Sequence, residues 1–144
     1  MSVANHLLSL LTYVSGISAF STSTGTSQGE QLPDPTGLYA NLPSTWVIYA
    51  GRAPISPAIN GVVAKGTAIK NQFVIMVYLD NSQGQDNLMA VQIPLLESIV
   101  SAVAGNPSLD TPDGYRFSFE GERLTSVNPK RLIYEMRFSI VSHV

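Results

Sequence analysis

The sequence predicts an α+β domain in which a largely antiparallel sheet of about four strands packs against two main helices on one face. Three observations carry this prediction. A chain of 144 residues fits one domain and buries a core without disulfides. Apolar residues recur at helical spacing in two segments and at strand spacing in four others. The order is helix, two strands, helix, two strands, so we expect one domain over residues 1–144.

The composition is unusually poor in charge. Charged residues make up 12% of the chain and hydrophobic residues 44%, with a mean hydropathy of +0.15. Two interpretations stay open: a surface rich in neutral polar side chains, or a surface covered by neighbouring subunits. The net charge of -2 gives no long-range attraction for nucleic acid or an acidic membrane. Because the chain has no cysteine, it has no disulfides or thiolate metal site, which fits a reducing compartment.

The first element is an amphipathic helix that Gly16 is expected to end. The segment LLSLLTYVSGISAF is also as apolar as a signal-peptide core. However, no Lys or Arg precedes it and no convincing cleavage site follows, so secretion by this route is not expected. The helical stripe consists of Val3, Leu7, Leu10, Leu11 and Val14.

Residues 21–43 (STSTGTSQGEQLPDPTGLYANLP) are rich in Ser, Thr, Gly and Pro and show no sustained period, so they predict a long loop. Loops of this length are commonly functional arms or mobile segments. An arm that contacts a neighbour and a mobile insertion are both open.

Two strands follow. Residues 45–52 (TWVIYAGR) are β-branched and aromatic and lie between prolines, and residues 68–80 contain the apolar run FVIMVYL. That run is too short to cross a membrane, which takes about 20 helical residues. Both of its faces are apolar, so one face is expected to pack on the helices and the other on a second layer or another subunit.

The next helix is predicted from an apolar stripe that ends before Gly105 and Pro107. Pro94 lies inside it and either kinks the helix or begins a second segment. The preceding DNSQGQD is read as a turn with Asp86 as a candidate N-cap, because it lacks the Gly and Glu positions of a calcium loop. The stripe consists of Leu88, Val91, Leu95, Ile99 and Val103.

The last two strands alternate apolar and polar residues, so each is expected to have one buried and one solvated side. Gly121 interrupts the first of them. The apolar positions are Tyr115, Phe117 and Phe119 in one strand and Leu132, Tyr134, Met136, Phe138 and Ile140 in the other.

No catalytic constellation is recognisable. His6 and His143 lie at opposite ends of the chain without acidic neighbours, so surface or packing roles are expected. There is no G-x-S-x-G, G-x-G-x-x-G or phosphate-loop motif. The acidic pairs Asp110 with Asp113 and Glu120 with Glu122 lie in hydrophilic sequence that would not raise a pKa. We therefore expect no enzyme activity, no cofactor and no metal.

Basic residues gather near the C-terminus, where five of the eight Lys and Arg follow Tyr115. They can pair with nearby acids, within the sheet or across a subunit boundary, or they can face DNA phosphates. Because acids are interleaved among them, pairing is favoured. The basic residues are Arg116, Arg123, Lys130, Arg131 and Arg137, and the acids are Glu120, Glu122 and Glu135.

The order of these segments resembles that of bacteriophage tail terminator, or tail completion, proteins of contractile-tailed phages. The resemblance spans residues 1–144 and is carried by TWVIYAGR, FVIMVYLD, DNLMAVQIPLLESIVSAVAG and above all by YRFSFEGERL and RLIYEMRFSIVSHV. It implies a homo-hexameric ring that caps the head-proximal end of the tail tube, ends its polymerisation and offers a surface for head-tail joining. It also implies assembly in the host cytoplasm and a place in the virion tail or neck.

The resemblance implies partners as well. These are other copies of the chain, the tail tube protein and possible sheath and head-tail connector proteins, with DNA only as passing cargo and no membrane. It implies polar subunit or tube contacts on or beside the strands. Two alternatives stay open: another ring-forming neck or tube protein, and a small ligand-binding or enzymatic α+β domain. The expected contact residues are Arg52, Arg116, Glu120, Arg123, Arg131, Glu135 and Arg137.

Overall fold

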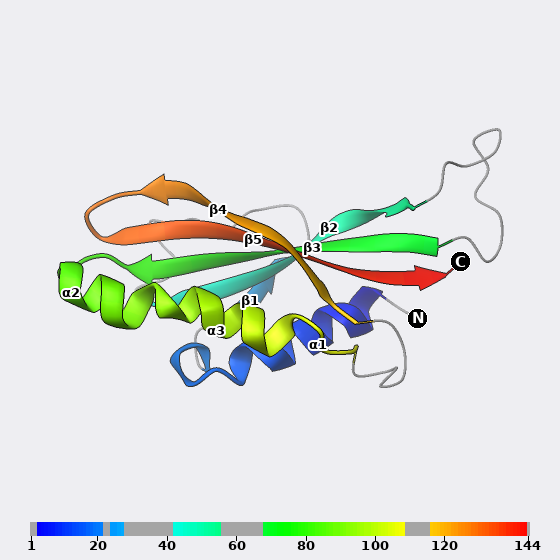
Figure 1. Cartoon of the computed structure of the whole chain (residues 1–144), viewed down its shortest axis with the longest axis horizontal. Helices are drawn as coiled ribbons and strands as arrows, with labels where there is room; N and C mark the ends of the chain where they lie inside the picture. The colour runs from blue at the N-terminus through cyan, green and yellow to red at the C-terminus, as the bar shows by residue number, and fades with distance from the viewer. Residues whose placement is uncertain (1–2, 22–23, 28–41, 56–67, 109–115, 144) are drawn as a thin grey trace.

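A five-stranded sheet with the order β1-β2-β3-β5-β4 carries helices on one of its faces (Figure 1). The computed structural model describes residues 3–21, 24–27, 42–55, 68–108 and 116–143. The elements are α1 (Val3–Ser15), the 3-10 turn η1 (Ser18–Phe20), β1 (Thr24–Ser27), β2 (Ser44–Pro54), β3 (Ala68–Asp80), α2 (Gln85–Asn87), the π-helical turn η2 (Leu88–Gln92), α3 (Pro94–Val103), β4 (Ser118–Val127) and β5 (Arg131–His143).

Four of the strands form the antiparallel sheet that the sequence predicts. β2 pairs with β3, β3 with β5 and β5 with β4, all antiparallel. β3 and β5 are paired along their whole lengths, from Ala68 opposite His143 to Asp80 opposite Arg131. The α+β class and the strand segments at 45–52 and 68–80 are thus confirmed.

The prediction of about four strands was incomplete, because β1 forms inside the segment predicted as a loop. β1 pairs parallel with β2, which makes the sheet mixed. The hydroxyls of Thr24 and Thr45 lie 2.9 Å apart, and Thr26 Oγ1 donates to the carbonyl of Val47 at 2.7 Å. Hydroxyl contacts of Thr24 and Thr26 help to hold β1 against β2. The sequence TGTS has no alternation of apolar residues, so the pattern did not predict a strand here. The remainder of the predicted loop, residues 28–41, lies outside the described part.

The core lies between the sheet and the helices on one face, as predicted (Figure 1). Phe73 is at its centre, with ring centroids at 5.5 Å from Tyr49 and 6.3 Å from both His6 and Phe117. His6 is buried, and its ring meets Phe73 and Phe117 edge-on. Of the two roles expected for this histidine, packing is therefore the one the structure shows. The core also includes Leu7, Leu10, Val14, Ile75, Val77, Leu96, Ile99, Val103, Met136 and Phe138.

Pro94 begins a second helical segment, one of the two possibilities that the sequence left open. Proline has no N–H to donate, so it is tolerated at the first turn of a helix. The turn before it is wider than an α-helix: the N–H of Ile93 bonds the carbonyl of Leu88 at 2.9 Å. The prediction of Asp86 as N-cap was wrong, because Gly84 occupies that position and Asp86 lies in the first turn.

Gly121 interrupts the alternation of β4, as predicted, but the strand continues past it. β4 runs from Ser118 to Val127, and Glu120 is the extra residue of a bulge between Phe119 and Gly121. Gly121 has a φ of 134°, a backbone conformation that other residues rarely adopt, so glycine allows the bulge.

The expectation of one solvated side for the last strand was only partly right. On β5, Ile133, Glu135 and Ser139 lie on the face opposite Met136 and Phe138, yet all three are buried. In the parts of the chain that the structure describes, no helix has the length and apolar character to cross a membrane.

Candidate interface on the C-terminal strands

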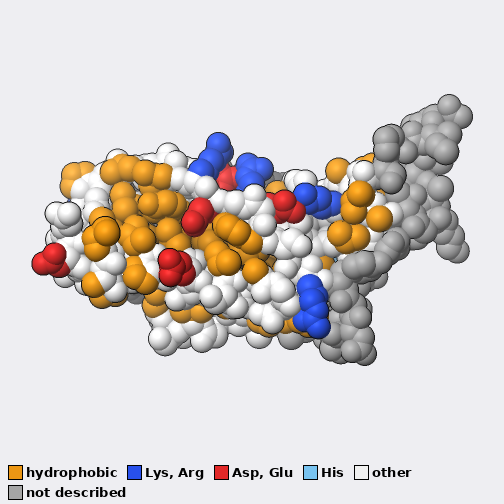
Figure 2. Space-filling model, in the orientation of Figure 1, with side chains coloured by type: hydrophobic (Ala, Val, Ile, Leu, Met, Phe, Trp, Pro, Cys, Tyr) orange, Lys and Arg blue, Asp and Glu red, His pale blue; other side chains and the backbone are white. Residues whose placement is uncertain are grey.

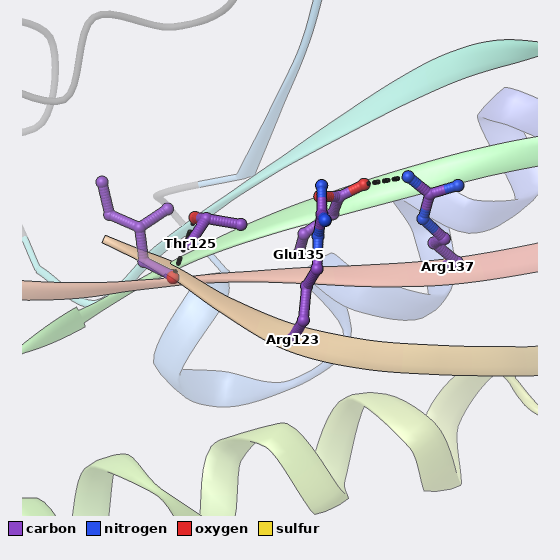
Figure 3. Close-up of polar contacts among 5 residues, drawn as sticks. Arg123, Thr125, Glu135 and Arg137 are labelled. Atoms are coloured by element: carbon purple, nitrogen blue, oxygen red, sulfur yellow. Dashed lines mark hydrogen bonds and ion pairs between the residues drawn. The ribbon is translucent and has the colours of Figure 1, made fainter. Parts of the chain in front are cut away.

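The carboxylate of Glu135 forms ion pairs with two arginines on the sheet face that points away from the helices (Figure 3). Arg123 approaches Glu135 Oε2 with Nε at 2.9 Å and Nη2 at 2.8 Å. Arg137 Nη2 lies 2.8 Å from the other oxygen, Oε1. The side chains of Arg123 and Arg137 are 68% and 55% exposed, whereas that of Glu135 is 11% exposed. The nearly buried carboxylate of Glu135 therefore holds two exposed guanidinium groups in place.

The strand register explains this cluster. Arg123 is the partner of Glu135 in the β4–β5 ladder, and Arg137 follows Glu135 by two positions on the same face of β5. The prediction that the C-terminal arginines pair with interleaved acids is confirmed for these residues, within the sheet. Burial raises the pKa of Glu135, but the hydrogen bonds and charges of Arg123 and Arg137 outweigh it and leave this pKa below its ordinary value of 4.5.

A second pair lies along the same face. Lys70 Nζ is 2.9 Å from Glu120 Oε1, and Ser139 Oγ donates to that oxygen at 2.5 Å. The hydrogen bond from Ser139 and the ammonium of Lys70 lower the pKa of Glu120. The sequence prediction missed Lys70, because it is 50 positions from Glu120 and only the pairing of β3 with β5 brings it near.

An open hollow of about 180 Å³ joins the two groups. Arg137 borders it together with Lys70, Gln72 and Glu120. We call the surface formed by Lys70, Glu120, Arg123, Glu135 and Arg137 the basic face, since three positive charges outnumber two negative ones.

The other predicted contact residues lie elsewhere. Arg116 Nη1 donates to the carbonyl of Gly105 at 2.9 Å, beside the end of α3. Arg52 is exposed on β2 opposite Asn71. Arg131 begins β5 opposite Asp80 and is half-buried. The structure therefore brings together four of the seven predicted residues: Glu120, Arg123, Glu135 and Arg137.

Several large apolar side chains are exposed. Those of η2 and β4 include Met89, Val91, Leu124 and Val127. Val91 belongs to the apolar stripe predicted for the helix but is 49% exposed, whereas Ile99 and Val103 of the same stripe are buried. The wider π-helical turn that contains Val91 departs from the spacing on which that prediction rests.

The described side chains include exposed charged and apolar groups that can contact another protein. Among the described residues, no group of three or more His, Asp or Glu could hold a metal ion. Asp110 and Asp113 lie outside the described part. The basic face and the exposed apolar side chains of β4 lie on opposite sides of the sheet.

Comparisons with known proteins give the fold. No family model matches the sequence, and no curated protein does either. Among solved structures, a chain of "Virion of native gene transfer agent (GTA) particle" matches with a TM-score of 0.57 and 15% identity, over 99% of this chain and 98% of that chain. At this identity the match shows a shared fold, and it extends over the whole of both chains.

Proposed function

We propose that this chain is a virion structural protein that acts as a tail terminator. A homo-hexameric ring of it would cap the head-proximal end of the tail tube, end tube polymerisation and present a surface for head-tail joining. The observation that carries the proposal is the match of fold over the whole chain to a component of a virion. The order of the sequence segments, which resembles that of the terminator family, agrees with it.

The surface supports a role in assembly. Only 12% of the residues are charged, and the exposed large hydrophobics include Met89, Leu124 and Val127. Large exposed apolar side chains that lie together usually mark a protein interface. In this role the chain needs no catalytic residue or cofactor, and its partners would be its own copies, the tube protein, and sheath and connector proteins of a contractile tail. DNA would only pass through the ring.

The mass of the purified protein in solution tests the proposal. Light scattering is measured on the chain alone and again with the tail tube protein of the same particle. We expect a hexamer, or a monomer that forms a ring only on the tube. A monomer that ignores the tube would refute the proposal.

A related function, as a tube or joining protein of the same particle, shares the observations above. The two differ in where assembly stops, because a terminator forms one ring and a tube protein adds ring upon ring. Growth of the mass with concentration, without a limit near six copies, would favour the tube protein.

A further inference from the structure

β4 lies at one edge of the sheet, and none of its residues is buried. Phe119, Leu124 and Val127 pair with the core residues Phe138, Tyr134 and Leu132, so they lie on the side that faces the helix layer. They remain 38%, 46% and 61% exposed, although α3 contacts β4, so the helix layer leaves these three side chains uncovered.

The π-helical turn η2, which contacts β3 and α3, carries two further exposed apolar side chains. In η2, Gln92 is buried and its Oε1 accepts the N–H of Asp80 at 3.1 Å, while Met89 and Val91 point to solvent. Asn81, in the turn between β3 and α2, bonds the β4–β5 turn: its N–H donates to Lys130 O and its Nδ2 to Asn128 O, both at 2.9 Å.

These contacts place η2 and the end of β4 at one end of the molecule. Figure 2 shows hydrophobic side chains gathered over this part of the surface, with acidic side chains at the border and basic ones above it. We call Met89, Val91, Leu124 and Val127 the apolar strip.

Acidic side chains outnumber basic ones around the apolar strip: Asp86, Glu97 and Glu122 are exposed there, against the exposed Lys130 of the β4–β5 turn. Residues 81–115, which include α2, η2 and α3, contain no Lys or Arg, and they contribute the exposed Asp86 and Glu97. Glu122 lies on the same side of β4, opposite Met136. Arg123 follows it in the chain but points to the other side of the sheet, where it belongs to the basic face. Each copy thus carries an acid-bordered apolar strip on one side of β4 and a net positive face on the other.

We infer that the apolar strip binds the basic face of a second copy. The two surfaces are complementary in charge, and they lie on opposite sides of one sheet, so every copy offers both. A contact between two different surfaces is heterologous and repeats from copy to copy, which closes a ring when the rotation allows it. The contact would be the subunit boundary of the proposed ring, and in that respect it rests on the proposed function.

A charge exchange at two neighbouring residues tests this contact. In this contact Glu122 of one copy faces Arg123 of the next. Glu122→Arg then sets arginine against arginine and Arg123→Glu sets glutamate against glutamate, so each variant alone should lose assembly by at least about tenfold in concentration. An equimolar mixture should recover assembly with alternating copies and an even copy number. The double variant E122R/R123E should also recover. Mass is measured by light scattering, with the tube protein present if wild type assembles only there.

An apolar variant tests the same surface independently. Val127→Asp should disperse the ring, whereas Leu8→Asp, at a leucine 57% exposed on α1, should not. Circular dichroism of each variant checks that the sheet still forms. A folded V127D that assembles like wild type would overturn the inference.

The outcomes separate this contact from the proposed function. Two results would overturn the contact and leave the terminator proposal standing. In the first, every charge variant forms the same ring as wild type. In the second, the single variants stay dispersed when they are mixed. If the single charge variants lose assembly and the mixture and the double variant recover it, but the assembled protein does not bind the tube, the contact is supported and the terminator proposal is refuted. A wild-type monomer with and without the tube would overturn both.

Discussion

Arg123 and Glu135 face each other across β4 and β5, with two nitrogens of the guanidinium, Nε and Nη2, within 2.9 Å and 2.8 Å of the same carboxylate oxygen. The carboxylate is nearly buried, and Arg137 binds its other oxygen. The pair therefore has two effects: it holds the edge strand to its neighbour, and it fixes two positive charges where another molecule can reach them.

Replacing Glu135 with Gln should lower the free energy of unfolding by about 1 kcal/mol, since a charged partner is lost but both arginines are exposed and solvated. Urea denaturation at pH 7, under conditions where the protein is monomeric, measures this. Glu122→Gln is the matched control, because Glu122 is exposed on the adjacent strand and its loss should leave stability unchanged. Equal stability of wild type and E135Q would show that the cluster does not stabilise the fold.

The stabilising effect of Glu135 should depend on pH. Its folded-state pKa lies below the ordinary value of 4.5, so its contribution is complete above that value and is lost as the pH falls through the folded-state pKa. Wild type should thus be more stable than E135Q at pH 7, and the difference should shrink below pH 4.5. Urea midpoints of both proteins across this interval measure it. A difference that grows on acidification would contradict the assigned ion pairs.

Phe73→Ala should remove about 3–5 kcal/mol from the free energy of unfolding, because Phe73 is completely buried and its ring contacts three other rings. Chemical denaturation measures the loss. Gln72→Ala changes the preceding, exposed position of the same strand and should have little effect. A small loss for F73A would place the centre of the core elsewhere.

Gly25→Ala should detach β1 from the sheet. A Cβ at this position would lie 2.7 Å from Cζ3 and 2.8 Å from Cε3 of Trp46, closer than real Cβ atoms approach their neighbours. Since Trp46 is the only tryptophan of the chain, its fluorescence reports the change directly. We expect a red-shifted emission with the core intact. An unchanged spectrum would mean that β1 does not pack against Trp46.

Much of the fold could be predicted because its elements carry strong periodic signals. The apolar run from Phe73 to Leu79 indicates a strand, whereas Pro94 left two possibilities open, a kink or a helix start, between which the structure decides. β1 gives no such signal, since hydroxyl contacts from Thr24 and Thr26 hold it and not apolar burial.

The candidate interface was predictable only where its residues lie on two strands that follow each other directly in the sequence. Arg123, Glu135 and Arg137 belong to two strands joined by a short turn, so alternation alone places them on one face. Lys70 joins Glu120 only through the distant pairing of β3 with β5. The apolar strip depends on which strand lies at the edge of the sheet, and the pattern of single residues does not contain that information.

Electron microscopy of tail tubes assembled with this protein tests the central claim most directly. The tube protein is polymerised alone and with increasing amounts of the chain, and tube lengths and tube ends are recorded. The terminator account predicts a single extra ring at one end of each tube and shorter tubes as the ratio rises. Bare ends and unchanged lengths, or copies bound along the tube wall, would contradict it.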